Sequence, residues 1–319
     1  MAQIILVGIG AGMASALLFA SLASGSFFAL LLFYLSPLPI LIAGIGWSYW
    51  AGMVAALCAA GALGLVFGSL FFLTFFVAIG LPAWWLSYLA LLARRVEGAA
   101  AGGIEWYPIG RLLLWAAVIG ALSVVVAIPY FGIDAESFHE NLRRAIEAAF
   151  GLRASRAPDA DVAAARIIDS DMLAVLAPPV AASATTIIHL VNVWLAARIV
   201  KLSGQLRRPW PDLSAIAFPR LTPAFLGAAV AGVFLPGIPG IIADIFAATL
   251  LMAYACLGFA VLHVVTRGID ARPFVLGGVY AAVIILNWPV LIMSVLGLAD
   301  TALDLRGRAM RKRGPPTLH

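Results

Sequence analysis

Charged residues are scarce in this chain. Of its 319 residues, 11% are charged and 64% are hydrophobic, whereas soluble domains carry about a quarter charged residues. No charged side chain occurs before residue 94. This composition predicts an integral membrane protein and excludes a soluble enzyme held by a single anchor.

Cysteine and lysine are also rare. Cys58 and Cys256 lie inside apolar runs, at a spacing that suits neither a metal site nor a disulfide framework. Only Lys201 and Lys312 are lysines, so the net charge of +5 rests on arginines that flank hydrophobic segments. Such arginines are typical of membrane topology signals. We therefore expect contact with a lipid bilayer, no nucleic-acid partner and no bound metal.

Sequence motifs for catalysis are missing. The chain has no metal-binding His-Glu-x-x-His, no phosphate-binding glycine loop and no Gly-x-Ser-x-Gly turn. The glycines at 8–12 imitate a dinucleotide-binding turn, but Met13 interrupts that pattern. We expect no cofactor and no enzyme. The alternative left open is a lipid-modifying activity of surface carboxylates, with Asp159, Asp161, Asp169 and Asp171 as the cluster to test.

Several apolar runs reach the length of about 20 residues that a bilayer crossing requires. Those before residue 201 are 3–22, 27–46, 50–67, 70–93, 111–129 and 178–200. Pro37, Pro39 and Pro82 should kink or end helices where neighbouring side chains satisfy the freed backbone groups. The first run lacks the basic start of a signal peptide, so we expect it to remain as a helix.

Residues 130–171 are polar, with five arginines and eight acidic residues. Phe138, Leu142 and Ile146 recur at helical spacing, which predicts an amphipathic helix near 135–152 on the bilayer surface. A second short helix is expected over 158–171, because proline and aspartate suit a helix start. We place the whole polar loop outside the cytoplasm.

The C-terminal third is harder to divide into crossings. Basic residues in 198–220 and in the tail 306–319 indicate the cytoplasmic side, which requires an even number of crossings between them. We therefore interpret 223–239, which contains a Pro-Gly run, as broken or re-entrant. The prediction is one all-α membrane domain, 1–319, with about eight crossings and both ends cytoplasmic in a bacterial inner membrane. The alternative is nine crossings.

Polar side chains inside the apolar runs are the candidate solute contacts. Thr185, His189 and Asn192 follow one another at i, i+4 and i+7, so one helix face carries all three. Asp244 is an acidic residue inside a long apolar run, and Asn287 precedes Trp288 and Pro289 at an expected kink. For each of them, the competing interpretation is a structural role: a hydrogen-bond network between helices, a helix start or a packing kink.

Small residues line the first helix in overlapping small-xxx-small patterns. Such patterns allow helices to approach closely. Close packing within the protein is one interpretation, and a docking face for a partner subunit, with Ala16 and Ala20, is the other.

Three stretches taken together carry a resemblance: 35–40 with 44–47, 80–86 with 91–94, and 297–300 with 304–306. This pattern resembles the YybS-like family of bacterial polytopic membrane proteins. That family is more distantly similar to the S components of energy-coupling-factor transporters, which bind vitamins or metal ions and work with a transmembrane coupling subunit and paired ATPases. In S components an Ala-x-x-x-Ala pattern contacts that subunit, and Ala16 with Ala20 has this spacing.

Two functions from different classes follow. The first is a transporter-like component that binds a small solute within the bundle through Thr185, His189, Asn192, Asp244 and Asn287. The second is a structural or scaffolding protein of the cell envelope, whose amphipathic segment and basic loops recruit partner proteins.

Overall fold

The computed structural model describes residues 1–96, 103–149, 170–212, 214 and 216–312. Their architecture is almost entirely helical, and a short antiparallel hairpin pairs β1 (Ala93–Arg95) with β2 (Ile104–Trp106). In this part of the chain, seven helical segments are long and apolar enough to cross a membrane, namely Ala2–Ser24, Phe27–Gly46, Tyr49–Phe67, Ser69–Leu91, Ile109–Phe131, Ser170–Leu202 and Ile238–Val265. The predicted all-α, polytopic bundle is confirmed.

The chain divides into two compact units. Unit 1 comprises Met1–Ala116 and Ile187–Phe218, and unit 2 comprises Ala117–Thr186 and Pro219–His319. Two helices, α7 (Ile109–Val125) and α10 (Ser170–Leu202), contribute residues to both units.

Unit 1 is built on the close approach of α1 (Ala2–Ala20) to α4 (Tyr49–Phe67). Gly8 and Gly12 of α1 are buried, and a Cβ atom at Gly12 would lie 2.6 Å from the carbonyl oxygen of Ala55. Only glycine therefore fits at this crossing. The small residues of the first helix thus mediate packing within the unit.

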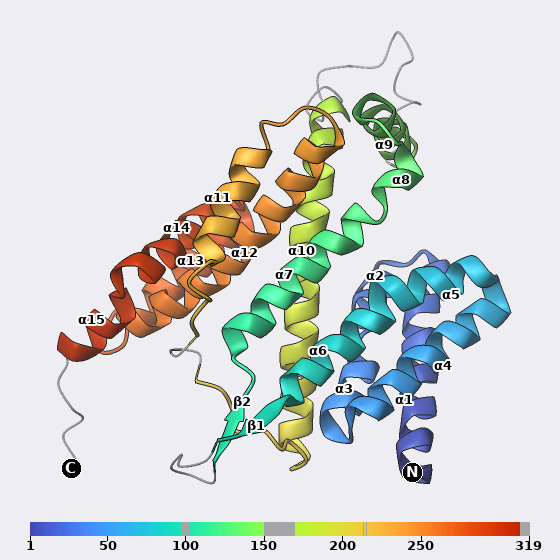
Figure 1. Cartoon of the computed structure of the whole chain (residues 1–319), viewed down its shortest axis with the longest axis horizontal. Helices are drawn as coiled ribbons and strands as arrows, with labels where there is room; N and C mark the ends of the chain where they lie inside the picture. Colours follow the sequence, from blue (N-terminus) through green and yellow to red (C-terminus); the bar gives the residue numbers. More distant parts are fainter. Residues whose placement is uncertain (97–102, 150–169, 213, 215, 313–319) are drawn as a thin grey trace. The chain divides into compact units, whose positions relative to one another are not determined.

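The remaining helices of unit 1 are short pieces of the predicted spans (Figure 1). They are α2 (Phe27–Tyr34), α3 (Leu38–Gly46), α5 (Ser69–Phe75), the π-helical turn η2 (Phe76–Gly80) and α6 (Leu81–Leu91), while η1 (Ser21–Ser24) extends α1. Serine hydroxyls cap two starts: Ser26 accepts from the amide of Ala29 at 3.2 Å, and Ser48 accepts from that of Ala51 at 3.3 Å.

In unit 2, the amphipathic helix is confirmed as α9 (Ala135–Ala149), which follows the short α8 (Ile128–Phe131). Its Phe138 is 3% exposed and packs with Ala121, Ala182 and Ile245. The apolar side of α9 therefore packs on protein helices. The end of the predicted helix at 150–152, and most of the second one expected at 158–171, lie outside the described residues; Ser170 begins α10.

The break predicted within 223–239 is present. Helix α11 (Thr222–Gly232) ends there, and α12 (Ile238–Val265) begins after Gly237, whose φ of +77° suits glycine. Ile241 and Phe246 of α12 pack against the cluster that holds Phe138. The turn between α11 and α12 therefore lies at the same end of unit 2 as α9.

The kink expected at Asn287 is instead a break between two helices. The apolar run 273–299 forms α13 (Arg272–Leu286) and α14 (Pro289–Leu303), separated at Asn287, whose φ is +61°. Tyr280 of α13 stacks on Phe259 of α12 with ring centroids 5.1 Å apart, whereas the Ser294 hydroxyl of α14 donates to the carbonyl of Leu251 at 2.7 Å. The chain thus reverses at Asn287. Each 15-residue helix is about 22 Å long, shorter than the roughly 30 Å hydrocarbon core.

Helix α14 crosses α12 at two glycines. A Cβ atom at Gly258 would overlap the carbonyl of Met293, and one at Gly297 would overlap that of Tyr254. After α14 the chain turns at Asp304 and enters the basic helix α15 (Leu305–Lys312). Figure 1 shows α11 to α14 lying beside one another.

Candidate functional site

The helix break between α2 and α3 lies in the middle of an apolar span. In an unbroken helix the carbonyl of Tyr34 would accept from the amide of Leu38, but here that amide donates to Leu35 at 3.0 Å. Pro37 and Pro39 add no amide hydrogens of their own. The break therefore leaves carbonyl oxygens that need donors from elsewhere, in a setting where water does not supply them.

Side chains from two other helices supply these donors. The amide nitrogen Nδ2 of Asn192, on α10, donates to the carbonyl oxygen of Tyr34 at 2.9 Å and to that of Ile188 at 2.8 Å. The hydroxyl of Ser15, on α1, donates to the carbonyl oxygen of Ser36 at 2.5 Å. Asn192 thus ties α10 to the broken helix, as the prolines predicted that some neighbouring side chain would.

Three buried side chains of unit 1, one at the break and two on α10, keep polar atoms without a partner among the described residues. They are the hydroxyl of Ser36, both ring nitrogens of His189 and the carbonyl oxygen Oδ1 of Asn192. His189 and Asn192 are each 2% exposed. We call Ser36, His189 and Asn192 the polar site of unit 1.

Each buried polar group without a hydrogen-bond partner typically lowers the free energy of unfolding by about 1–3 kcal/mol. His189 lies one turn before Asn192 on the same buried face of α10. A neutral imidazole offers one donor and one acceptor, and the free Asn192 oxygen and Ser36 hydroxyl add further capacity. Each of these three side chains therefore keeps hydrogen-bonding capacity that no described residue uses.

Of the predicted contacts, His189 and Asn192 meet in this site, and the others lie elsewhere. Thr185 is half-buried, and its hydroxyl donates to the carbonyl of Ala181 on its own helix at 2.8 Å. The buried threonine on this helix is Thr186, whose hydroxyl donates to Ala182 at 2.9 Å. The helical spacing to Asn192 does not predict which of the two adjacent threonines is buried, because both lie near the edge of the buried face.

Asp244 and Asn287 both belong to unit 2. Asp244 is half-buried in the second turn of α12, and Asn287 is exposed at the end of α13. Asn287 thus occupies the backbone reversal, where a positive φ favours asparagine or glycine over most residues. The five predicted contacts are not gathered within one unit.

The residues proposed for docking differ in exposure. Ala16 is 6% exposed within unit 1, and Ala20 is half-buried. Ser36 is the residue that sequence reasoning missed. Its signal was present, since it stands directly before the proline that breaks the span.

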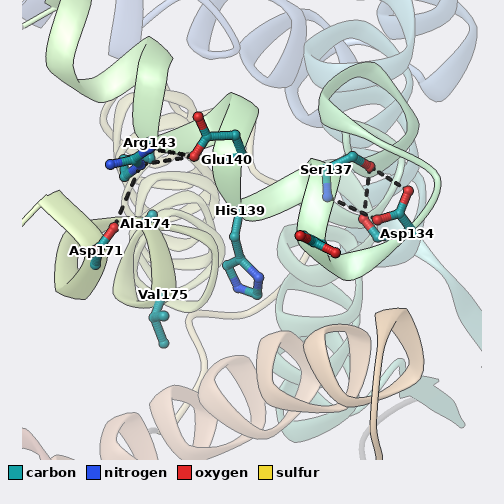
Figure 2. Close-up of a pocket in the computed structure, with 9 residues that line it drawn as sticks. Asp134, Ser137, His139, Glu140, Arg143, Asp171, Ala174 and Val175 are labelled. Carbon is teal, nitrogen blue, oxygen red and sulfur yellow. Dashed lines mark hydrogen bonds and ion pairs between the residues drawn. The ribbon is translucent and has the colours of Figure 1, made fainter.

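Unit 2 carries a different feature, an open cavity of about 750 Å³ beside α9 and the start of α10 (Figure 2). Four of the nine residues that line it are acidic, namely Asp134, Glu136, Glu140 and Asp171. Arg143 joins the two helices, lying 2.5 Å from Glu140 and 3.6 Å from Asp171.

Local hydrogen bonds lower the pKa of two of these carboxylates, Glu140 and Asp134. Arg143 and Arg144 hold the pKa of Glu140 below its usual value by hydrogen bonding to its carboxylate. The amide and hydroxyl of Ser137 do the same for Asp134. The other carboxylates proposed for catalysis, Asp159, Asp161 and Asp169, lie outside the described residues. Within the described part of the chain, no group of three or more His, Cys, Asp or Glu residues could hold a metal ion.

Comparison with known proteins identifies a family. Residues 13–301 match the model of the family described as "Predicted membrane protein (DUF2232)". No curated protein and no solved structure matches the chain.

Proposed function

The chain belongs to the DUF2232 family of predicted membrane proteins, and for this multi-pass membrane protein we propose a role as a transporter-like component that binds a small polar solute at the polar site of unit 1. The proposal places the protein in a bacterial inner membrane with both ends cytoplasmic. It assigns no catalytic step and no cofactor.

One observation carries the proposal: neither ring nitrogen of His189 has a partner among the described residues, although the residue is 2% exposed. Ionisable residues inside membrane bundles are costly and tend to mark substrate paths. If His189 served only to join helices, we would expect its ring nitrogens to form a hydrogen bond to another helix. Asn192 does this with its side-chain amide. A solute that bonds to His189 would supply the missing partners.

The chemistry of the site favours a particular class of solute. Ser36, neutral His189 and Asn192 bear no formal charge, and together they present donors and acceptors. We therefore expect a small, uncharged or zwitterionic molecule with several hydrogen-bonding groups.

The helix break supports transport more than storage. Transporters often bind solutes at the midplane, where discontinuous helices expose backbone groups. Here the carbonyls of Tyr34 and Ser36 lie at such a break, and each accepts a hydrogen bond from a side chain of another helix. A solute that competes for these bonds would couple its binding to the geometry of α2 and α3.

Energy coupling would come from a second subunit. The resemblance to the S components of energy-coupling-factor transporters makes a transmembrane coupling subunit with ATPases the expected partner. The face of α1 that carries Ala20 would be the place to dock it, because Ala16 is buried in unit 1.

The test uses the full chain purified in mild detergent from its native membrane. Bound small molecules are identified by mass spectrometry for the wild type, for His189→Phe and for the matched control Thr185→Ala. Phenylalanine keeps a ring of similar size but removes both nitrogens, whereas the Thr185 hydroxyl donates to a carbonyl of its own helix.

We expect one enriched small molecule with the wild type and the control, and at least a roughly tenfold loss with His189→Phe. The thermal midpoint of His189→Phe should not fall, because the substitution removes unpartnered buried groups. The absence of any enriched molecule, or equal recovery from His189→Phe, would contradict the proposal. Proteins recovered in the same preparation test the coupling subunit.

A further inference from the structure

One end of unit 1 gathers most of its positive charge. The basic side chains there come from the β hairpin, the start of α7, the end of α10 and the loop after it: Arg94, Arg95, Arg111, Arg198, Lys201, Arg207 and Arg208. We call this region the basic end. It is independent of the polar site inside the bundle.

Two of its arginines, Arg207 and Arg208, donate hydrogen bonds to backbone carbonyls of unit 1. The guanidinium of Arg208 donates to the carbonyls of Ala90 at 3.2 Å and Tyr107 at 2.8 Å, and that of Arg207 donates to Trp47 at 3.0 Å. Ala90 and Trp47 lie at the ends of α6 and α3, where helices present free carbonyls and partial negative charge. Arg94 is likewise occupied, since it lies 2.6 Å from Glu105.

Arg198 and Lys201 are different. Both are exposed, and both lie over the ring of Trp210, with the guanidinium carbon 5.8 Å and the ammonium nitrogen 4.6 Å from its centroid. Neither forms an ion pair with a carboxylate of the described residues. Two like charges next to the same ring repel each other, and an anion between them would relieve that repulsion.

The surroundings indicate which anion this is. Arg198 and Lys201 occupy the last turns of α10, a helix long and apolar enough to cross a membrane. Tryptophan and tyrosine concentrate at the level of lipid headgroups, and Trp47, Tyr49, Trp106 and Tyr107 accompany Trp210 at this end. The two cations are therefore expected at the depth of the phosphate groups of the bilayer.

We infer that Arg198, Lys201 and Trp210 form a binding site for the phosphate of an anionic phospholipid. Both cations lie over the same indole ring, and the phosphate oxygens accept from both. An anionic headgroup binds here in preference to a zwitterionic one, whose own ammonium group would approach the two cations.

The test measures lipid binding to the purified full chain by native mass spectrometry, with phosphatidylglycerol and phosphatidylcholine as probes. The double variant Arg198→Gln with Lys201→Gln should lose about tenfold or more of its affinity for phosphatidylglycerol and little for phosphatidylcholine. Trp210→Ala removes the ring over which both cations lie and should also weaken phosphatidylglycerol binding.

The matched control removes the same charge from the same end: Arg95→Gln with Arg111→Gln, both exposed residues. An equal loss of phosphatidylglycerol affinity in the two double variants would show that the net charge of this end alone determines lipid binding. That result would overturn the proposed site. Glycerol 3-phosphate, a soluble probe, should not displace the lipid at millimolar concentration. Displacement would show that a soluble phosphate compound is the occupant, and would overturn the lipid assignment.

Discussion

Asn192 and His189 lie one turn apart on the same buried face of α10, yet their side chains differ in what they bind. Asn192 uses both amide hydrogens on carbonyls of Tyr34 and Ile188. Both nitrogens of His189 are left without a protein partner among the described residues. At the scale of single residues, Asn192 therefore explains how α10 joins a broken helix, and His189 is the group that calls for a solute.

Asp300 gives a prediction about stability at this scale. Its carboxylate lies 2.8 Å from the guanidinium of Arg306 and accepts from the Arg306 amide at 3.0 Å, and the two side chains are 4% and 11% exposed. Removing one partner of a buried pair leaves the other charge without compensation. We expect Asp300→Asn to destabilise the protein by about 3 kcal/mol, measured as a lower thermal midpoint in detergent.

The control for this prediction is Asp304→Asn. Asp304 pairs with Arg311 at 2.9 Å, but both side chains are more than half exposed. Water screens such a pair, so its loss should leave the midpoint nearly unchanged. Equal shifts for Asp300→Asn and Asp304→Asn would contradict the burial argument.

Glycines set the spacing of helices in unit 2, and their effect is predictable at the scale of elements. A Cβ atom at Gly258 would overlap the backbone of α14, whereas at Gly277 of α13 nothing lies within 4 Å. Gly258→Ala should therefore push α12 and α14 apart and destabilise the unit by about 2 kcal/mol. Gly277→Ala should be neutral or stabilising by up to about 1 kcal/mol, since alanine favours a helix.

Thermal unfolding of the two variants checks this, with intact oligomeric behaviour on gel filtration as the control. A midpoint for Gly258→Ala that equals the wild type would mean that α12 and α14 do not meet at this glycine. A fall for Gly277→Ala would mean that α13 has a neighbour that the structure does not show.

Elements differ in how well the sequence predicts them. Hydropathy was sufficient for the long spans, because their apolar length is their defining property. It failed at 273–299, where Asn287 reverses the chain between two apolar helices and the run of apolar residues continues across the turn. The break at Pro37 was predictable, because proline removes amide donors, but the donor that satisfies Tyr34 lies 158 residues away on α10.

Which of the predicted site residues lie together also depends on contacts between distant segments of the chain. Periodicity placed His189 and Asn192 on one face, which the structure confirms, but it also included Thr185, which lies beside that face. Asp244 and Asn287 were chosen because they are polar in apolar runs. A polar residue can also occur in an apolar run because it begins a helix or forms a turn. Polarity within an apolar run therefore does not predict that two such residues lie close to each other.

At the scale of the whole molecule, the chain is a multi-pass membrane protein of two compact units, with seven helical segments in its described part that could cross a bilayer. The family match over residues 13–301 spans both units. The polar site lies within unit 1, and the open acidic cavity lies within unit 2. Unit 1, which contains the broken helix, is therefore the unit in which we propose that the solute binds.

The nitrogen NMR signals of His189 report directly on whether a solute binds at this histidine. The full chain, labelled with ¹⁵N-histidine, would be measured as purified from its native membrane and again after prolonged dialysis to remove bound small molecules. His263 is the internal control, because its Nδ1 already lies 2.8 Å from the carbonyl of Phe259. We expect the signals of His189 to change between the two preparations while those of His263 stay constant. Identical His189 signals in both preparations would contradict a solute at this histidine.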